Sequence, residues 1–556
     1  MKFDSVFCIA RRWSIVAWLA APTSVLADTA SLPALGLPTT PLPSDSELEQ
    51  AGARIGEIEI DNQDVFDARD PKENRGLYRL SNRLHIETKP ELIKRQLLFK
   101  SDDEYSRRLL DESARILRSQ RFFYNAEVVP VRYVNGRVDV RVTTRDVWSL
   151  NPGVSFSRRG GKSTYGVELE ELNLLGRGVS VGIHHKSGID RDVRRIDFAD
   201  RHLLGQRLEL LASYGNNSDG DEMHLGLERP FYALDTRRAM GASVESVDRV
   251  NSLYALGQVD SQFREQANSF DAYAGWSSGL RDGWARRWLV GYTRDRREFE
   301  ALPGHVDGDV LPENRDLSYP WVGFELVQDE FATLENHDQI GRTEDFLLGT
   351  RLEARLGYST TGFGSDRNAL IYHATFDRGI ALSPRSTVTL GSALEGRWQD
   401  GRAQGLLFES NARYYFQQSE RWLLFANLDA TYSHALDLDQ QLLLGGDNGL
   451  RGYPLRYQGG DKSARFTIEQ RFFSDWYPFR LFRVGGAVFF DAGRTFGDDP
   501  LGTPNYGLLK DIGIGLRLGN TRSGLGNVVH VDLAFPLDGP SDLKAMQFQI
   551  ETRKEF

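Results

Sequence analysis

From Pro152 to its end, the chain is a succession of runs in which apolar and polar residues alternate, separated by Gly, Asp, Asn and Ser. Within residues 482–492 the even-numbered residues are apolar, whereas the odd-numbered residues include the charged Asp491; we call these two sets the apolar and the polar parity of the run. Residues 512–518 and 529–537 repeat the pattern. Because successive side chains of a strand point to opposite faces, each run predicts a strand with one apolar and one polar face. A soluble β-sandwich also alternates, but its inner face does not carry charges.

The number of these runs indicates a closed membrane barrel, because only a closed barrel leaves no unpaired strand edge in hydrocarbon. We therefore predict that residues 150–556 form an antiparallel transmembrane β-barrel, with about twenty strands by direct tally. The Leu-Leu-Gly sequences within 173–176 and 202–205 predict short turns at one rim, and 303–316 predicts a longer loop at the other. A mean hydropathy of −0.43 and 26% charged residues exclude a bundle of membrane helices.

The first 27 residues have the features of a cleaved secretory signal peptide. Arg11 and Arg12 precede the apolar run 13–21, and Val25 and Ala27 suit a signal peptidase. Cleavage removes the single cysteine, three basic residues and one acidic residue, so the net charge of −10 becomes more negative by two. The predicted mature chain therefore has no disulfide and no thiolate metal ligand. Its acidic balance argues against a nucleic-acid partner.

A proline-containing linker is predicted at 28–53, followed by a small α+β domain at 54–147. Residues 55–60 predict a strand, and two helix starts follow, each with a capping box, at Thr88–Glu91 and Ser101–Glu104. Two β-rich runs within 128–144 are joined by an Asn-Gly hairpin signal. The predicted order is strand, helix, helix, strand, strand.

One glycine-rich stretch inside the barrel region, Gly445–Tyr453 (GGDNGLRGY), carries a single arginine, Arg451. Glycine, aspartate and asparagine tolerate left-handed backbone conformations, so this stretch can fold back sharply while presenting a long cation. The partner of that cation is the main question that the sequence raises.

The α+β domain, with Phe122 and Phe123 leading into its second strand, resembles a polypeptide-transport-associated (POTRA) domain. Nearly the whole predicted mature chain resembles the BamA-like outer-membrane assembly and translocation superfamily, also called bacterial surface antigens. Leu450-Arg451-Gly452-Tyr453 matches the (V/I)RG(F/Y) motif of that family, with leucine in place of a β-branched residue, and residues 489–493 match its F-x-D-x-G motif. The family barrel has sixteen strands, and residues 61–87 are a long insertion for its domain.

The resemblance implies a lumenal latch, in which Arg451 pairs with Asp491 and with a glutamate on the preceding strand. Alternation also places Asp491 and Glu469 on the polar parities of their strands, so both carboxylates are expected in the lumen. The candidate latch residues are Arg451, Gly452, Tyr453, Glu469, Asp491 and Gly493. The aromatic C-terminus resembles the signal that marks outer-membrane barrels for assembly, here Phe548, Ile550 and Phe556.

The function expected from these features is non-enzymatic assembly or translocation in the bacterial outer membrane. An exposed strand edge of the 54–147 domain would dock an unfolded polypeptide or a periplasmic accessory protein. The barrel, embedded in outer-membrane lipid, would insert or pass the cargo by opening between its first strand, near Val154–Arg158, and its last, near Phe548–Glu555. A passive pore, a structural barrel and a two-partner-secretion-like transporter remain alternatives, and the cargo stays open.

Enzyme and metal sites are not predicted. The G-x-S-x-G strings at 178–182 and 275–279 lie in strand-like runs with no helix after them, so neither fits a serine hydrolase. His184 and His185 are adjacent and would face opposite sides of a strand. The acidic turns at 216–222 and 305–309 lack a complete calcium-binding loop. We therefore assign no catalytic, metal or cofactor residue.

Overall fold

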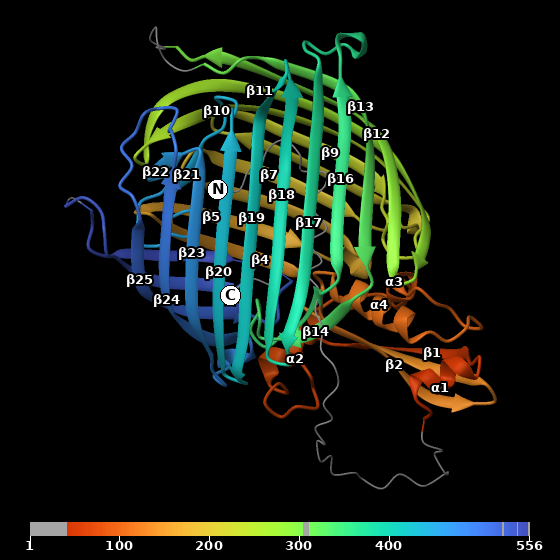
Figure 1. The fold of residues 1–556 in the computed structure, drawn as a ribbon. Coiled ribbons are helices and arrows are strands. Elements are labelled where there is room, and N and C mark those ends of the chain that lie inside the picture. Colours follow the sequence, from red (N-terminus) through yellow and green to blue (C-terminus); the bar gives the residue numbers. More distant parts are fainter. Residues whose placement is uncertain (1–41, 304–310, 525–527, 542, 554–556) are drawn as a thin grey trace.

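The computed structural model describes residues 42–303, 311–524, 528–541 and 543–553 (Figure 1). The predicted signal peptide, the acidic turn 305–309 and Phe556 lie outside these ranges. A barrel forms most of the molecule, and a small domain of sheet and helices lies at one end of it. We name that end of the barrel proximal and the opposite end distal. No helix in the described ranges is both long and apolar enough to cross a membrane.

The N-terminal domain is a three-stranded sheet with helices packed on it. Strand β3 lies between β1, to which it is parallel, and β2, with which it forms a hairpin. Ile93, Leu110 and Leu117 of the helices are buried with the valines of β3 in one core. The elements are α1 (Asp45–Gln50), β1 (Arg54–Gln63), α2 (Gly76–Leu84), α3 (Pro90–Gln96), α4 (Arg107–Arg118), β2 (Phe123–Val134) and β3 (Arg137–Asp146).

The ends of the helices differ from the sequence predictions. Residues 28–53 are not wholly a linker, because α1 lies inside this range: Ser44 caps it through a capping box, and Leu48 is fully buried in the domain core. Neither predicted capping box forms, since α3 and α4 have no side-chain cap. The hydroxyl of Thr88 instead donates a hydrogen bond to the buried Asp146 at 2.8 Å.

Twenty strands close into one barrel in the described part of the chain. The direct tally is therefore confirmed, and the sixteen strands that the resemblance implied are wrong for this chain. The barrel strands are β4 (Leu150–Arg159), β5 (Lys162–Glu171), β6 (Val179–Ser187), β7 (Asp192–Asp200), β8 (Glu209–Asn217), β9 (Gly220–Arg229), β10 (Arg238–Ala255), β11 (Gln258–Arg281), β12 (Trp284–Ala301), β13 (Arg315–Gln328), β16 (Thr350–Ser359), β17 (Ala369–Ser383), β18 (Ser386–Gln399), β19 (Arg402–Ser419), β20 (Trp422–His434), β23 (Lys462–Phe473), β24 (Phe482–Phe496), β25 (Leu509–Asn520), β26 (Val528–Pro536) and β27 (Gln547–Arg553).

Two insertions interrupt the succession of barrel strands. The hairpin β14 (Phe331–Glu335) and β15 (Thr343–Leu347) leaves the wall at the proximal end, between β13 and β16. The loop 435–461 leaves it at the distal end, between β20 and β23, and contains the short pair β21 (Leu442–Leu444) and β22 (Gln458–Gly460). Both insertions pack inside the barrel, as described below.

The two faces of the wall differ in the way that alternation predicts. On β24, Val488 is 55% exposed on the outer face, whereas Asp491 is fully buried on the inner face. The same outward exposure of apolar side chains recurs around the barrel, for example at Val154, Ile183, Ile196, Val322, Leu356, Leu428 and Ile514. An apolar outer surface on a closed barrel fits an outer-membrane location.

The domain rests on two short turns of the proximal rim, the Leu-Leu-Gly turns at 174–176 and 203–205. Leu175 and Leu204 adopt nearly the same left-handed conformation, with φ of 56° and 55°. The Gly176 oxygen accepts a hydrogen bond from the amide of Lys89 at 3.0 Å. Next to the second turn, Arg207 donates to the Arg95 oxygen at 2.8 Å. These contacts fix α3 of the domain against the barrel.

Candidate functional site

The distal loop 435–461 turns into the barrel instead of extending away from it. Its side chains Leu444, Leu450, Tyr453 and Tyr457 form a buried cluster with Leu509 of β25. The backbone can turn this tightly because of its glycines. A Cβ atom at Gly445 would lie 2.4 Å from the Pro454 oxygen, and one at Gly446 would lie 2.3 Å from the Tyr453 oxygen. Any other residue at these positions would push the two arms of the loop apart.

Arg451 lies at the inner end of this loop, only 2% exposed. Its Nε donates to Asp491 Oδ2 at 2.7 Å and its Nη2 donates to Asp491 Oδ1 at 2.9 Å. Nη1 donates to Glu469 Oε1 at 2.7 Å. The guanidinium also covers the ring of Phe489, 3.4 Å from its centroid. Burial lowers the pKa of Arg451, but Asp491 and Glu469 outweigh it and raise that pKa well above its ordinary value, so the arginine stays charged.

The other candidate residues shape the contact between the loop and the wall. A Cβ at Gly452 would lie 2.7 Å from Cβ of Asp511, so glycine lets the loop lie against β25. Gly493 leaves room for the side chains of Leu444 and Leu450. The hydroxyl of Tyr453 donates to the oxygens of Lys510 and Asp538, at 2.8 and 3.0 Å.

Further buried charges surround Arg451. Arg471 donates through Nε to Glu469 Oε2 at 2.9 Å, so Glu469 is shared between two arginines. On the next strands, Arg517 and Asp532 form a buried ion pair, and Asp532 is 3.8 Å from Arg451. Alternation puts Arg471 and Arg517 on the polar sides of their strands, but sequence analysis assigned neither of them a partner, and it missed Asp532, which also lies on a polar side.

The same loop lies across the seam where the first and last strands meet. Within the described residues, strands β27 and β4 share one register pair, Ile550 with Arg158, whereas β26 and β27 share seven. Gln549 of β27 donates to the Arg451 oxygen at 2.9 Å, and Arg159 of β4 donates to the Asp447 oxygen at 3.5 Å. The loop therefore bridges the strand pair that has the fewest register pairs among the described residues of the barrel. Phe548 and Ile550 lie on the outer parity of β27, opposite the buried Gln549.

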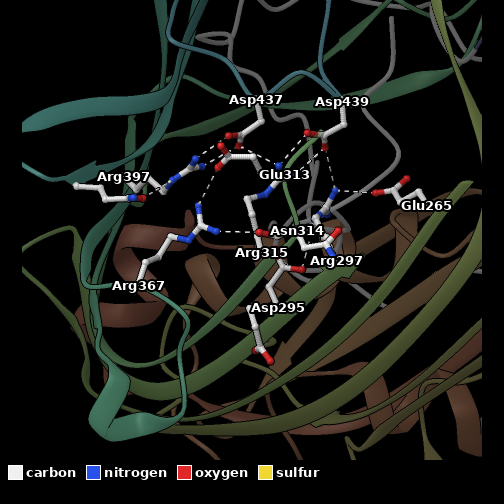
Figure 2. Close-up of polar contacts among 12 residues, drawn as sticks. Glu265, Asp295, Arg297, Glu313, Asn314, Arg315, Arg367, Arg397, Asp437 and Asp439 are labelled. Carbon is white, nitrogen blue, oxygen red and sulfur yellow. Dashed lines mark hydrogen bonds and ion pairs between the residues drawn. The ribbon is translucent and has the colours of Figure 1, made fainter. Parts of the chain in front are cut away.

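An ionic cluster at the distal end fixes the base of the loop (Figure 2). Asp437 accepts two hydrogen bonds from Arg397, at 2.7 and 2.6 Å, and Asp439 accepts two from Arg315, both 2.9 Å. Arg297 of β12 pairs with Asp439, at 3.7 Å, and with Glu265 of the neighbouring strand β11, at 3.0 Å. These residues were not predicted. The only signal in the sequence is a pair of aspartates directly after a strand.

The proximal hairpin 329–349 reaches the same network from the other end. Its tip residue Ile340 is buried in the lumen among Tyr415, Phe425 and other wall residues. The oxygen of His337 accepts a hydrogen bond from Arg471 at 2.9 Å. Since Arg471 and Arg451 share Glu469, the hairpin and the distal loop are linked through two side chains of β23, Arg471 and Glu469.

The hairpin is also held by the N-terminal domain. Arg118 of α4 forms an ion pair with Asp345 of β15, in which its Nε lies 2.6 Å from Oδ2. Arg342 donates to the Phe123 oxygen of β2 at 2.9 Å, and Arg115 lies over the ring of Phe331 at 3.7 Å. A continuous series of contacts therefore runs from α4 through the hairpin to Arg451.

Fold and site together define a class: a closed barrel with an apolar outer face, an inward-folded loop held by a buried arginine, and an α+β domain at one mouth. No family model matches the chain. Over 130 residues, 22% of this chain, it is 30% identical to a Treponema pallidum (strain Nichols) protein named "Putative outer membrane protein assembly factor". The match spans 15% of the length of that relative.

Three solved structures align with most of this chain. BamA from Haemophilus ducreyi lacking POTRA domains 1-3 is 14% identical, with 89% of this chain and 84% of that chain covered and a TM-score of 0.39. CdiB from Acinetobacter baumannii gives 12% identity, 90% and 74% coverage and a TM-score of 0.42. CdiB from Escherichia coli is 14% identical, with 89% of this chain and 76% of that chain covered and a TM-score of 0.46. The chain is similar to BamA-like outer-membrane proteins.

Proposed function

We propose that this chain is a non-enzymatic outer-membrane protein that inserts or translocates polypeptides, with Arg451, Asp491 and Glu469 acting as a latch on the lumenal loop. The observation that carries the proposal is the seam, at which the described residues of β27 and β4 share a single register pair bridged by the latch loop. Because a strand pair with few main-chain hydrogen bonds separates at low cost, the seam can open, and an open seam offers two strand edges to a client strand.

The N-terminal domain supplies the docking surface in this proposal. In the described part of the chain, β2 is an edge of its three-stranded sheet. The start of β2 is covered, since Phe123 and Ala126 accept hydrogen bonds from Arg342 and Arg118. From Glu127 to Val134 the strand exposes Val129, Val131 and Val134. An unfolded client or a periplasmic accessory protein adds here as a further strand.

The seam is tested by a disulfide lock. The natural chain has one cysteine, Cys8, inside the predicted signal peptide, so introduced pairs are unambiguous. Arg158→Cys with Ile550→Cys closes β4 on β27, and the control pair Val531→Cys with Ile550→Cys closes β26 on β27, which are already paired. The readout is the folding of an unfolded outer-membrane barrel into proteoliposomes that contain the full-length protein.

We expect the oxidised seam lock to abolish client folding, reduction to restore it, and the control pair to leave it unchanged. Client folding that persists through the oxidised seam lock contradicts insertion through the seam. A passive pore is the second candidate, favoured by a polar cavity of about 380 Å³ between the N-terminal domain and the inner face of β5–β8. In a passive pore, solute flux is the only activity, and neither lock changes it.

A further inference from the structure

The insertion between β1 and α3 carries a helix whose apolar side is exposed in the part of the chain that the structure describes. In α2, Leu77, Leu80 and Leu84 are 74%, 48% and 64% exposed. Their spacing of three and four residues puts them on one side of the helix. Single exposed leucines are ordinary on a protein surface, but a continuous row of them marks an interaction surface.

The opposite side of α2 is firmly attached to the domain and the barrel. Tyr78 stacks on Phe66, with ring centroids 4.6 Å apart, and its hydroxyl donates to the Phe479 oxygen at 2.9 Å. Asn82 makes two hydrogen bonds with the backbone of Phe66, at 2.7 and 3.1 Å. Arg522, between β25 and β26, donates to the Val65 oxygen at 2.6 Å. The exposed leucines therefore belong to a helix of fixed orientation.

Arginines occupy the remaining sector of the helix. Arg75, at the N-cap, and Arg79 and Arg83, within α2, are spaced by four residues and are exposed. The helix itself has no acidic residue. A helix with leucines on one side and arginines on the neighbouring side is typical of segments that lie in the surface of a bilayer, where leucines enter the acyl region and arginines meet phosphates.

The neighbourhood of α2 continues the lipid-facing surface of the barrel. The turn between β23 and β24, which holds Tyr78, exposes Trp476 at 65% and Phe479 at 75%. On the outer face just above it, Trp422 and Phe472 pack together with ring centroids 4.8 Å apart. Aromatic side chains form a belt where barrel walls leave the membrane. Figure 1 shows α2 at this proximal end, beside the ends of the barrel strands.

We propose that α2 is an interfacial anchor: Leu77, Leu80 and Leu84 enter the proximal leaflet of the membrane, and Arg75, Arg79 and Arg83 bind the phosphates of its lipids. The proposal rests on the outer-membrane placement in the proposed function, and it adds a second attachment to the bilayer outside the barrel. This surface fits a lipid layer, because the leucines and the arginines lie side by side on one helix, as the acyl region and the phosphates do in a bilayer. The anchor holds the N-terminal domain at a set angle beneath the barrel.

The test uses the full-length protein in vesicles of phosphatidylethanolamine and phosphatidylglycerol. Single cysteines replace Leu80, Arg132 or Val488 and carry an environment-sensitive fluorophore. Leu80→Cys reports α2, Arg132→Cys reports the far hairpin of the domain, and Val488→Cys reports the middle of the barrel wall. Quenching by nitroxide-labelled lipid and by iodide in the water is measured at each site.

We expect the labels at Leu80 and Val488 to be quenched by the lipid and shielded from iodide, and the label at Arg132 to behave in the opposite way. If Val488 is not quenched by lipid, the membrane placement itself fails. If Val488 is quenched while Leu80 stays as open to iodide as Arg132, only the anchor is overturned. Shielding of Leu80 by an added unfolded polypeptide, without lipid quenching, assigns α2 to client binding and overturns the anchor too.

A separate measurement tests the role of the arginines of α2. Arg79→Ser removes one charge from the surface that faces the phosphates, and each such charge contributes about 1 kcal/mol at an anionic membrane, which is about fivefold in the docking equilibrium. We expect lipid quenching at Leu80 to weaken in Arg79→Ser and in vesicles without phosphatidylglycerol. Equal quenching in all three cases overturns the role of the arginines.

Discussion

Arg451 joins a loop to two neighbouring strands, since Glu469 lies on β23 and Asp491 on β24. Its guanidinium serves both carboxylates at once because it is planar and has five donors, whereas a lysine ammonium is a compact point charge. Phe489 covers the remaining face of the guanidinium. The site therefore selects arginine by shape as well as by charge.

We expect Arg451→Ala and Arg451→Lys both to lower the heat resistance of the folded barrel, because the buried Asp491 loses its bidentate partner, while Glu469 retains Arg471. Removing one partner of a buried ion pair costs about 3 to 5 kcal/mol. The measurement is the temperature at which the protein loses its compact form in semi-native gel electrophoresis. The control is Arg494→Ala, at an exposed arginine of β24, the strand that carries Asp491. It should change stability by less than about 0.5 kcal/mol. A wild-type transition in Arg451→Ala would reject the latch.

Alternation could place Asp491 and Glu469 on the inner face because the period of two residues is a local property of each strand. It could not pair Arg517 with Asp532, because that pairing depends on the stagger between β25 and β26, which no single run encodes. The number of strands followed from counting runs, whereas the number taken from the resemblance was too small. Asp437 and Asp439 lie in a loop, where no period exists to mark them.

At the scale of elements, the hairpin 329–349 is the part that sequence analysis least foresaw. Its strands are five residues long and too short to show alternation clearly. It nevertheless connects the N-terminal domain to the latch, through Asp345 at one end and His337 at the other. Under the proposed function, such a contact would let a client docked on the domain change the position of the loop, since both act on one element.

We expect Asp345→Ala to weaken the attachment of the latch loop to the barrel wall, although Asp345 lies in the hairpin and does not contact Arg451. The ion pair between Arg118 and Asp345 is largely buried, so the double-mutant cycle of Arg118→Ala and Asp345→Ala should give a coupling of about 1 to 3 kcal/mol. Hydrogen exchange measured by mass spectrometry should show faster exchange at residues 445–453 in Asp345→Ala. The control, Glu335→Ala, changes an exposed residue of the same hairpin and should leave exchange there unchanged. Unchanged exchange in Asp345→Ala would remove the hairpin from the coupling.

At the scale of the whole molecule, the lumen is filled from both ends. The latch loop enters from the distal end and the hairpin from the proximal end, and the two are linked through Glu469 and Arg471 of β23. A barrel of twenty strands is wide enough to need such filling, because strand number sets barrel diameter. The proposed opening for a client would therefore require movement of an insertion as well as separation of the seam. The ionic cluster of Figure 2 fixes where the larger insertion can pivot.

The cluster predicts how the closed state is maintained. In the double variant Asp437→Asn and Asp439→Asn, the base of the loop loses its charged partners, and Arg315, only 6% exposed, loses both carboxylates that pair with it. An uncompensated buried charge costs about 3 to 5 kcal/mol, so the loop base should detach from the wall. We expect a larger mean conductance and more frequent current steps in single-channel recordings from planar bilayers. Asp400→Asn, at an exposed distal turn, is the matched control. Recordings of the double variant that match those of the control would show that the distal cluster does not hold the lumen closed.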